Sequence, residues 1–256
     1  MQPKATLEDT LHLMRDLRAR CEWDAAQTHD SLRPYLIEEA HELDDALRDL
    51  DRSKMREELG DVLLQVLFHS VIAEEEGTFT VADVARGLIE KMERRHPHLY
   101  GDGVRVPWEQ LKAEQQTRTS LEEGLPVGLP ALHRAHRLQD RAAGVGFDWD
   151  DVNGPADKVA EEMQEVRQLL RSEEPGARSE ALEAELGDLL FAVVNLCRKA
   201  GAHPALALDK ANAKFARRFA AMERLAAERG IDVATAGLTV LDGLWDEVKA
   251  SEPSSR

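Results

Sequence analysis

The chain carries an internal repeat that spans nearly its whole length. Four short stretches occur in the same order in both halves, and chance is a poor explanation for four ordered matches. The pairs are ELGDVL at 58–63 with ELGDLL at 185–190, EEAHE at 38–42 with EEMQE at 161–165, KMERR at 91–95 with KFARR at 214–218, and WEQLK at 108–112 with WDEVK at 245–249. The sequence therefore predicts a duplicated unit. We expect an N-terminal unit at 1–121, a linker rich in Gly and Pro at 122–130, and a C-terminal unit at 131–256.

The apolar residues of both halves follow a helical period. Residues 59, 62, 63, 66 and 67 form one apolar stripe, and residues 186, 189, 190, 193 and 194 form its counterpart. No convincing period-two run indicates a strand, and aromatic residues make up only 5% of the chain. We therefore expect an all-α fold of two helical-bundle units. The expected helices cover about 6–20, 34–50, 54–76, 81–96, 107–121, 130–143, 155–172, 178–200, 204–229 and 239–250.

The charge balance excludes several kinds of partner. Lys and Arg total 33 against 49 Asp and Glu, a net charge of −16, which disfavours non-specific binding to nucleic acid and to anionic membranes. A phosphorylated small molecule can still bind if metal ions separate the negative charges. The two cysteines, Cys21 and Cys197, form no CxxC pattern, so neither a disulfide scaffold nor a structural zinc site is expected from them. No signal peptide and no run of eighteen apolar residues is found, so we expect a cytoplasmic protein.

Paired carboxylates recur in both halves. Glu39 and Glu42 are three residues apart on one expected helix, and Glu58 and Asp61 are three apart on the next, so each pair shares a face. The helical wheel places Glu39 on the apolar side of its helix, and Glu162 lies equivalently in the second half. A buried carboxylate is costly unless it is compensated, and neither stripe carries a lysine. One ExxE alone indicates a solvated acidic face, but the recurrence of all four carboxylates favours bound divalent cations such as Mg²⁺.

The order of these motifs resembles the MazG family of nucleoside triphosphate pyrophosphohydrolases. Stretches at 23–24, 27–28, 93–98, 146–149, 211–212 and 214–215 are also similar to this family. The resemblance covers both units. It implies an all-α fold, an intertwined homodimer, dependence on Mg²⁺ with Mn²⁺ as a substitute, and hydrolysis of nucleoside triphosphates to monophosphate and pyrophosphate. Residues 20–24 read RCEWD and lack the Gly and Pro of the family's turn, so the second half is expected to dominate turnover.

The resemblance also assigns site residues. The catalytic set is Glu162, Glu165, Glu185, Asp188 and Glu161. Metal ligands would be Glu162, Glu165, Glu185 and Asp188 in the second half, and Glu39, Glu42, Glu58 and Asp61 in the first. Nucleotide contacts would come from Lys158, Val159, Ala160, Glu161, Glu162, Ala181, Leu182, Glu183, Ala184, Asp188, Lys214, Phe215, Ala216, Arg217, Arg218 and Trp245, with Arg95 and Lys112 as further candidates.

The chemistry of these residue types fits a triphosphate. Arginine forks suit phosphate oxygens, and Trp245 is expected either to stack on a base or to pack inside the protein. Glu161 or Glu38 is a candidate to orient the attacking water. The preferred nucleotide stays open, including deoxynucleotides and non-standard nucleotides.

Two other functions stay open from the residues. His41 completes an E-x-x-H, the motif of di-iron carboxylate bundles, although Gln164 replaces it in the second half. A non-catalytic regulatory protein with acidic interaction helices is the second alternative. Turnover of nucleoside triphosphates in Mg²⁺ would separate the enzyme from both.

Overall fold

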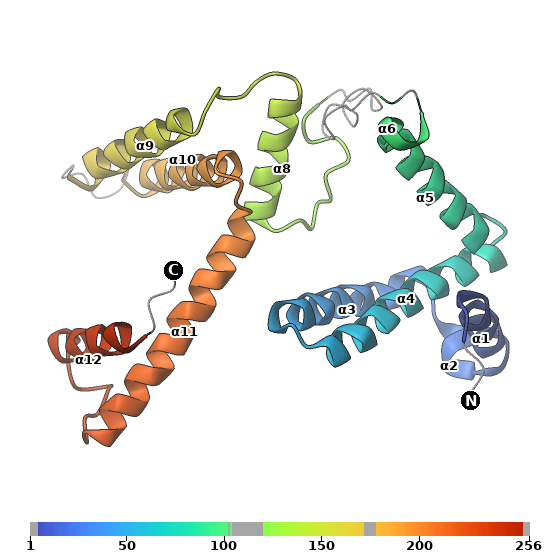
Figure 1. The fold of residues 1–256 in the computed structure, drawn as a ribbon, viewed down its shortest axis with the longest axis horizontal. Helices are drawn as coiled ribbons and strands as arrows, with labels where there is room; N and C mark the ends of the chain where they lie inside the picture. The colour runs from blue at the N-terminus through green and yellow to red at the C-terminus, as the bar shows by residue number, and fades with distance from the viewer. Residues whose placement is uncertain (1–4, 102, 104–119, 172–177, 253–256) are drawn as a thin grey trace. The chain divides into compact units, whose positions relative to one another are not determined.

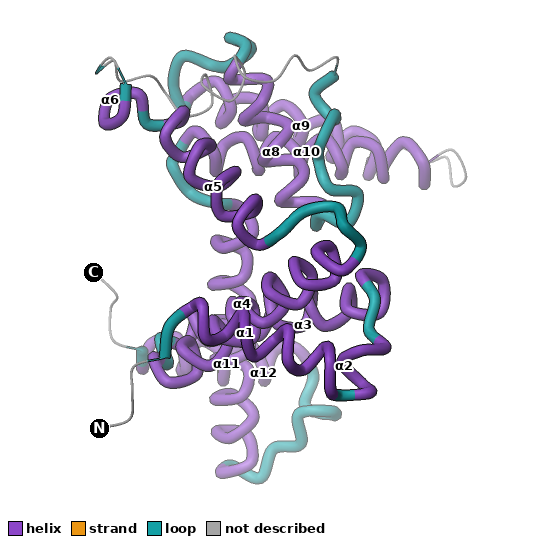
Figure 2. Tube along the Cα trace, turned by 90° about the vertical axis from the view of Figure 1, so that its right-hand side faces the viewer, coloured by secondary structure: helices purple, strands orange, loops and turns teal. Residues whose placement is uncertain are grey.

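All regular elements in the described part of the chain are helices. The computed structural model describes residues 5–101, 103, 120–171 and 178–252. Within these ranges no strand occurs (Figure 2), which confirms the all-α prediction. None of the described helices is long and apolar enough to cross a membrane. The chain divides into compact units at 1–106 and 107–256. The domain limits expected from the sequence, at 121 and 131, stay predictions.

The first unit contains two long antiparallel helices and several shorter ones (Figure 1). Helices α3 and α4 pack along each other, α1 packs on α2 and α4, and α5 follows from the far end of α4. The elements are α1 (Leu7–Arg20), α2 (Glu22–Ala26), α3 (His29–Asp49), α4 (Arg52–Glu75), α5 (Val81–Arg95) and α6 (Pro97–Tyr100).

The second unit repeats the long hairpin and adds a projecting arm. Helices α9 and α10 pack along each other, α8 packs on α10, and α11 contacts α8, α12 and the end of α10 (Figure 1). The elements are α8 (Ala131–Gly144), α9 (Asn153–Arg171), α10 (Arg178–Lys199), α11 (Pro204–Glu228) and α12 (Leu238–Ser251).

Most helix ends agree with the sequence prediction, and the start of α3 is the main correction. The sequence predicted that this helix begins at about residue 34. It begins at His29 instead, because Thr28 and Ser31 form a capping box that satisfies the exposed amides of the first turn. The short helices α2 and α6 were not predicted. The helix expected at 107–121 lies outside the described residues except for its last two.

A small apolar core and one arginine hold the first unit together. Residues from α1, α3 and α4 form the core: Leu11, Met14, Leu32, Leu67, Phe68, Val71 and Ile72. Beside it, the guanidinium of Arg18 donates to the carbonyl oxygens of Asp24 at 2.6 Å, Ala25 at 3.2 Å and Gln27 at 2.9 Å, and it pairs with the carboxylate of Glu75. Arg18 therefore joins α1, the end of α2 and the end of α4.

The second unit has its clearest core on the arm. Met222 and Ala226 of α11 pack with Leu244 and Val248 of α12. The arm begins at an elbow after α10, where Gly201 has a positive φ of 74° that glycine adopts without strain. Pro204 then opens α11 at a position where its missing amide hydrogen costs nothing.

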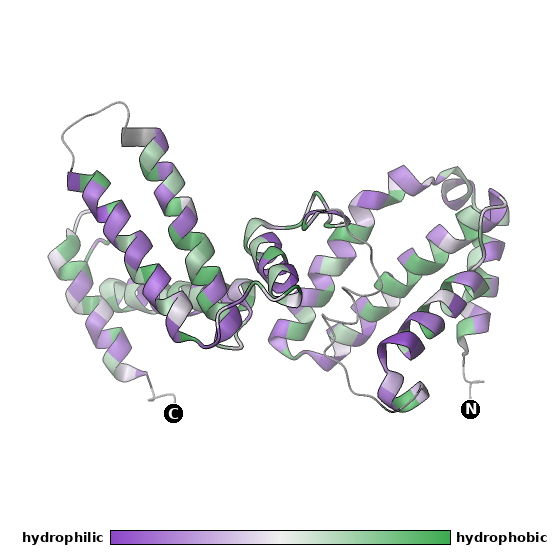
Figure 3. Ribbon diagram, turned by 90° about the horizontal axis from the view of Figure 1, so that it is seen from above, coloured by the Kyte–Doolittle hydropathy of each residue, from purple (hydrophilic) through white to green (hydrophobic). Residues whose placement is uncertain are grey.

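The two long hairpins leave much apolar surface uncovered. The predicted stripes are only partly buried: Leu67 and Val194 are inside, whereas Leu59 is exposed and Leu190 is 59% exposed. Hydrophobic and hydrophilic residues both occur along the helices (Figure 3). A pair of helices cannot bury its whole apolar stripe by itself, so part of each stripe stays exposed among the described residues.

Candidate metal and nucleotide site

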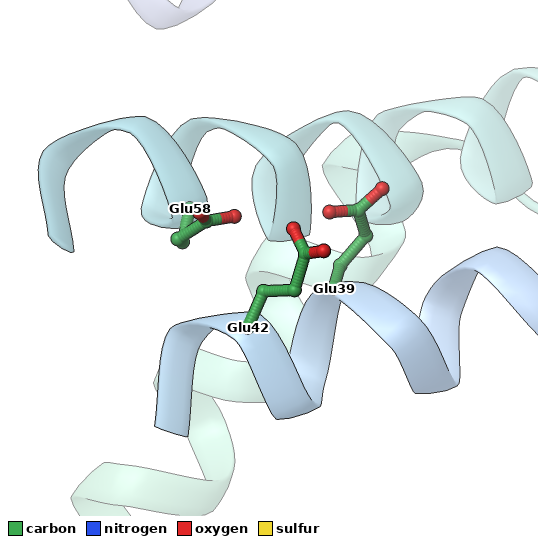
Figure 4. Close-up of side chains that lie close together, drawn as sticks. All are labelled: Glu39, Glu42 and Glu58. Carbon is green, nitrogen blue, oxygen red and sulfur yellow. The ribbon is translucent and has the colours of Figure 1, made fainter. Parts of the chain in front are cut away.

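Each unit presents its acidic residues between the helices of its long hairpin. In the first unit Glu39 and Glu42 project from α3, and Glu58 projects from α4 toward them (Figure 4). Ligand oxygens of these three residues all lie within 4.8 Å of one another. The i, i+3 spacing on α3 produces this arrangement, because both side chains share the face that meets α4.

The first cluster is electrostatically strained. Glu58 is only 5% exposed. Burial raises the pKa of Glu58 and the negative charge of Glu42 raises it further, while Lys54 opposes the rise. Burial also raises the pKa of Glu39, with added repulsion from Asp61 and Glu42. Asp61 is thus close enough to repel Glu39, although it is not one of the three residues that converge.

The second cluster is built on α9 and α10. Here Glu162, Glu185 and Asp188 bring ligand oxygens within 4.8 Å of one another. Glu162 is 5% exposed. Glu165 is the fourth member of the predicted set; burial, together with the neighbouring Glu162 and Glu185, raises its pKa. Three of the four predicted carboxylates thus converge in each unit, but they are a different three.

A lysine that belongs to neither apolar stripe enters the second cluster from α9. The ammonium of Lys158 lies 2.7 Å from Glu162 and 3.0 Å from Glu161. The hydrogen bond from Lys158 lowers the pKa of Glu162. Lys158 was expected as a phosphate contact; it lies one turn before Glu162 on α9 and therefore shares its face.

The remaining predicted residues of α9 and α10 lie next to the acidic residues along the sequence. Glu161 is exposed on α9, as its counterpart Glu38 is on α3. Val159 and Ala160 lie on α9 directly before Glu161 and Glu162. The helical turn of α10 directly before Glu185 contains Ala181, Leu182, Glu183 and Ala184. All belong to the hairpin that forms the cluster.

The basic residues are not brought to the cluster within one unit. Lys214, Phe215, Ala216, Arg217 and Arg218 lie on α11, which in the described part of the chain has no contact with α9. Glu252 accepts hydrogen bonds from Arg218 at 2.6 Å and from Arg217 at 3.5 Å. Arg95 ends α5, which contacts α4 and α6 and not α3. Lys112 lies outside the described residues.

Trp245 is packed on the arm. Its ring lies 5.3 Å from that of Phe215, centroid to centroid, and it contacts the core between α11 and α12. Its side chain is half-buried. This position agrees with the packing alternative; a contact with a base stays a prediction.

A groove of about 620 Å³ lies beside the hairpin in the second unit. Sequence reasoning did not identify it, although its turn of Gly146, Phe147, Asp148 and Trp149 was noted as family-like. The signal available was the apolar character of Phe191, which is exposed here. Arg198 and Lys199 hold Asp148, so the turn is anchored to the end of α10.

Fold and site together define a class: an all-helical protein whose paired helices carry acidic clusters suited to divalent cations. The family model described as the MazG nucleotide pyrophosphohydrolase domain matches residues 27–100 and 156–221. The chain belongs to the MazG family and contains its domain twice, which confirms both the duplication and the assignment as an enzyme.

Three relatives are similar to this chain over nearly all of its length. A nucleoside triphosphate pyrophosphohydrolase/pyrophosphatase MazG of Thermotoga maritima is 43% identical over 253 residues, covering 96% of each chain. A nucleoside triphosphate pyrophosphohydrolase of Escherichia coli K12 is 41% identical over 249 residues, covering 93% of this chain and 94% of its own. The uncharacterized protein YabN of Bacillus subtilis is 46% identical over 254 residues, covering 95% of this chain and 51% of its own.

Proposed function

We propose that the protein hydrolyses nucleoside triphosphates, including deoxy or non-standard ones, between the α and β phosphates. The products are a nucleoside monophosphate and pyrophosphate. One observation carries the proposal: the converging oxygens of Glu162, Glu185 and Asp188 match the donors that Mg²⁺ prefers. The names of the Thermotoga and E. coli relatives support the substrate class.

The carboxylates have the chemistry to hold a divalent ion. Glu162, Glu185 and Asp188 would hold it, with Glu165 as a further ligand, and Mn²⁺ accepts the same oxygen donors. A bound ion supplies positive charge beside the phosphate oxygens. Burial first, and the neighbouring carboxylates second, raise the pKa of Glu39, of Glu58 and of Glu165. This fits the assignment, because a cation would compensate carboxylates held this close in a partly buried place.

The remaining groups bind the triphosphate and orient water. Lys158 can release Glu162 to a cation and direct its own charge to a phosphate. Glu161 is exposed next to the cluster and is our candidate to orient the attacking water. The basic side chains of Lys214, Arg217 and Arg218 would stabilise the charge that develops on pyrophosphate.

We further propose that a second copy of the chain completes this site. The basic residues of α11 do not reach the acidic cluster of their own unit, while α9 and α10 expose apolar residues that need a partner: Met163, Leu170, Leu186, Leu190, Phe191 and Val193. A homodimer would cover these faces and supply the basic helix together.

Product analysis tests the proposed reaction. The purified full-length protein is incubated with a panel of nucleoside triphosphates in Mg²⁺, in Mn²⁺ and in EDTA, and the products are separated by anion exchange. Monophosphate and pyrophosphate in equal amounts are expected with either ion and neither is expected in EDTA. Diphosphate and orthophosphate would contradict the proposal, because they place cleavage between the β and γ phosphates.

A further inference from the structure

Three histidines gather at the elbow of the second unit, apart from the acidic cluster. His133 and His136 lie three residues apart on α8 and therefore share a face, and His203 is the residue that precedes α11. The ring of His203 lies 4.9 Å from that of His133 and 4.7 Å from that of His136, between centroids. Two elements distant in sequence thus place three imidazoles together.

Among the described residues, one buried nitrogen atom of the cluster has no partner, and a second has only a distant carboxylate. The Nδ1 atoms of His136 and His203 are buried, and neither has a hydrogen bond to any described residue. Buried polar atoms in proteins nearly always have a partner, so the Nδ1 atom of His203 indicates a missing one. The carboxylate of Asp140 lies 3.4 Å from Nδ1 of His136 and accepts a hydrogen bond from Arg137 at 2.9 Å.

The ring spacing suits one shared ion. At a Zn–N distance of about 2.0–2.1 Å, two imidazoles on a tetrahedral ion have centroids about 5 Å apart. The observed planes meet at 70° and 37°, and as the side chains stand the three rings do not bring a ligand nitrogen each within 4.8 Å of one another. Binding therefore requires rotation of the side chains while the helices keep their spacing.

We propose that His133, His136 and His203 form a binding site for a transition-metal ion of the Zn²⁺ type, with Asp140 as the carboxylate that orients or completes it. Imidazole donors select Zn²⁺, Cu²⁺ or Ni²⁺, whereas the carboxylate clusters select Mg²⁺ or Mn²⁺. The ion cross-links α8 to the start of α11 next to the elbow at Gly201. The site therefore fixes the direction of the arm that carries Lys214 and Arg217.

Zinc titration of the full-length protein tests the site. The chelator-stripped protein is titrated with ZnCl₂ in millimolar MgCl₂, which saturates the carboxylates, and bound zinc is counted after dialysis. One ion per chain is expected. A variant with His136→Gln and His203→Gln should lose it, while Asp140→Asn should weaken binding by about 10–100-fold.

A matched control is available in the first unit. His29 and His69 are also adjacent, with 2.7 Å between their Nδ1 atoms. A variant with His29→Gln and His69→Gln should keep one zinc per chain. Equal zinc binding by the folded His136→Gln, His203→Gln protein, or loss of zinc from the control instead, would overturn the proposal.

If the variants do not fold, X-ray absorption of zinc bound to the unmodified protein identifies the ligands of the ion. Imidazole scattering from about three rings is the expected result. A shell of oxygen atoms alone would overturn the site.

Discussion

The ammonium nitrogen of Lys158 lies 2.7 Å from a carboxylate oxygen of Glu162, inside the acidic cluster of the second unit. The equivalent position in the first unit is Tyr35, whose ring meets Trp23 edge-on at 6.4 Å. The only lysine acting on the described first cluster is Lys54, from the other helix. The two halves of the duplication thus compensate similar negative charge in different ways.

Replacing Lys158 should separate nucleotide binding from metal binding. Lys158→Ala removes a competitor for Glu162 and a positive charge for the triphosphate. We expect the KM for the nucleotide to rise about tenfold, while Mg²⁺ binds as well as before or more tightly. Steady-state kinetics and calorimetry measure the two quantities. Lys158→Arg is the control and should keep most of the affinity; weaker Mg²⁺ binding in Lys158→Ala would contradict the role assigned here.

Removing one carboxylate from each half should show which half carries turnover. Glu185→Ala loses an anionic ligand of the second cluster, and we expect kcat/KM to fall on the order of a hundredfold or more, about 2.7 kcal/mol. Glu58→Ala should cost much less. Circular dichroism checks that both variants fold. The opposite pattern, with Glu58→Ala inactive and Glu185→Ala near wild type, would assign the main site to the first half.

Mixing two inactive variants tests whether a second copy completes the site. Glu185→Ala lacks the acidic cluster, and a variant with Lys214→Ala and Arg217→Ala lacks the basic helix. After mixing and exchange, each mixed dimer has one complete site, so about a quarter of wild-type activity should return.

The control for this experiment mixes Glu185→Ala with Glu162→Ala. Both damage the same cluster, so no activity should return. Recovery in neither mixture, with dimers present by light scattering, would show that partner copies do not share the site.

The contacts of Arg18 should make it a large contributor to stability. Arg18→Ala removes the donor to the carbonyl oxygens of Ala25 and Gln27 and to the carboxylate of Glu75, while the carbonyl oxygen of Asp24 keeps the N–H of Gln27 at 3.2 Å. We expect a loss of about 2 kcal/mol or more in the free energy of unfolding. Urea unfolding measures it. Arg20→Ala removes a highly exposed arginine from the same helix and should cost little. Equal losses in the two variants would refute the assignment.

The pair of Arg18 and Glu75 also predicts a pH dependence. The hydrogen bond from Arg18 holds the pKa of Glu75 below its usual value. The ion pair therefore stabilises the folded protein fully above the pKa of Glu75 in the unfolded chain, about 4.3. This stabilisation is lost as the pH falls through the lower pKa that Glu75 has in the folded protein.

Glu75→Gln should accordingly be less stable than wild type at pH 7, and the difference should shrink toward pH 3. Glu57→Gln, at an exposed position on the same helix, serves as the control. A difference between Glu75→Gln and wild type that stays constant with pH would show that the ion pair is not its source.

The sequence predicted the long helices well because each carries several turns of periodic residues. It missed α2 and α6, which are too short to show a period. At α3 the predicted start at about residue 34 came too late, because the capping box at Thr28 determines where the helix begins.

The candidate site was predictable at the level of one hairpin. The i, i+3 spacing of Glu39 and Glu42 places both on one face, and the repeat supplies the second cluster. The choice of three among four carboxylates depends on side-chain contacts such as that of Lys158, which a helical wheel does not resolve. The separation of α11 from the cluster depends on helix packing, which short motifs do not encode.

The three carbonyl oxygens that Arg18 binds lie within ten residues of it, but its carboxylate partner follows 57 residues later. During synthesis on the ribosome, α1 and α2 therefore emerge well before Glu75. Helix α1, with α2 packed on it, cannot pack on α4 until α4 has been synthesised. The apolar residues of α1 are open to chaperones and proteases during that interval, so translation speed through α3 and α4 bears on the yield of folded protein.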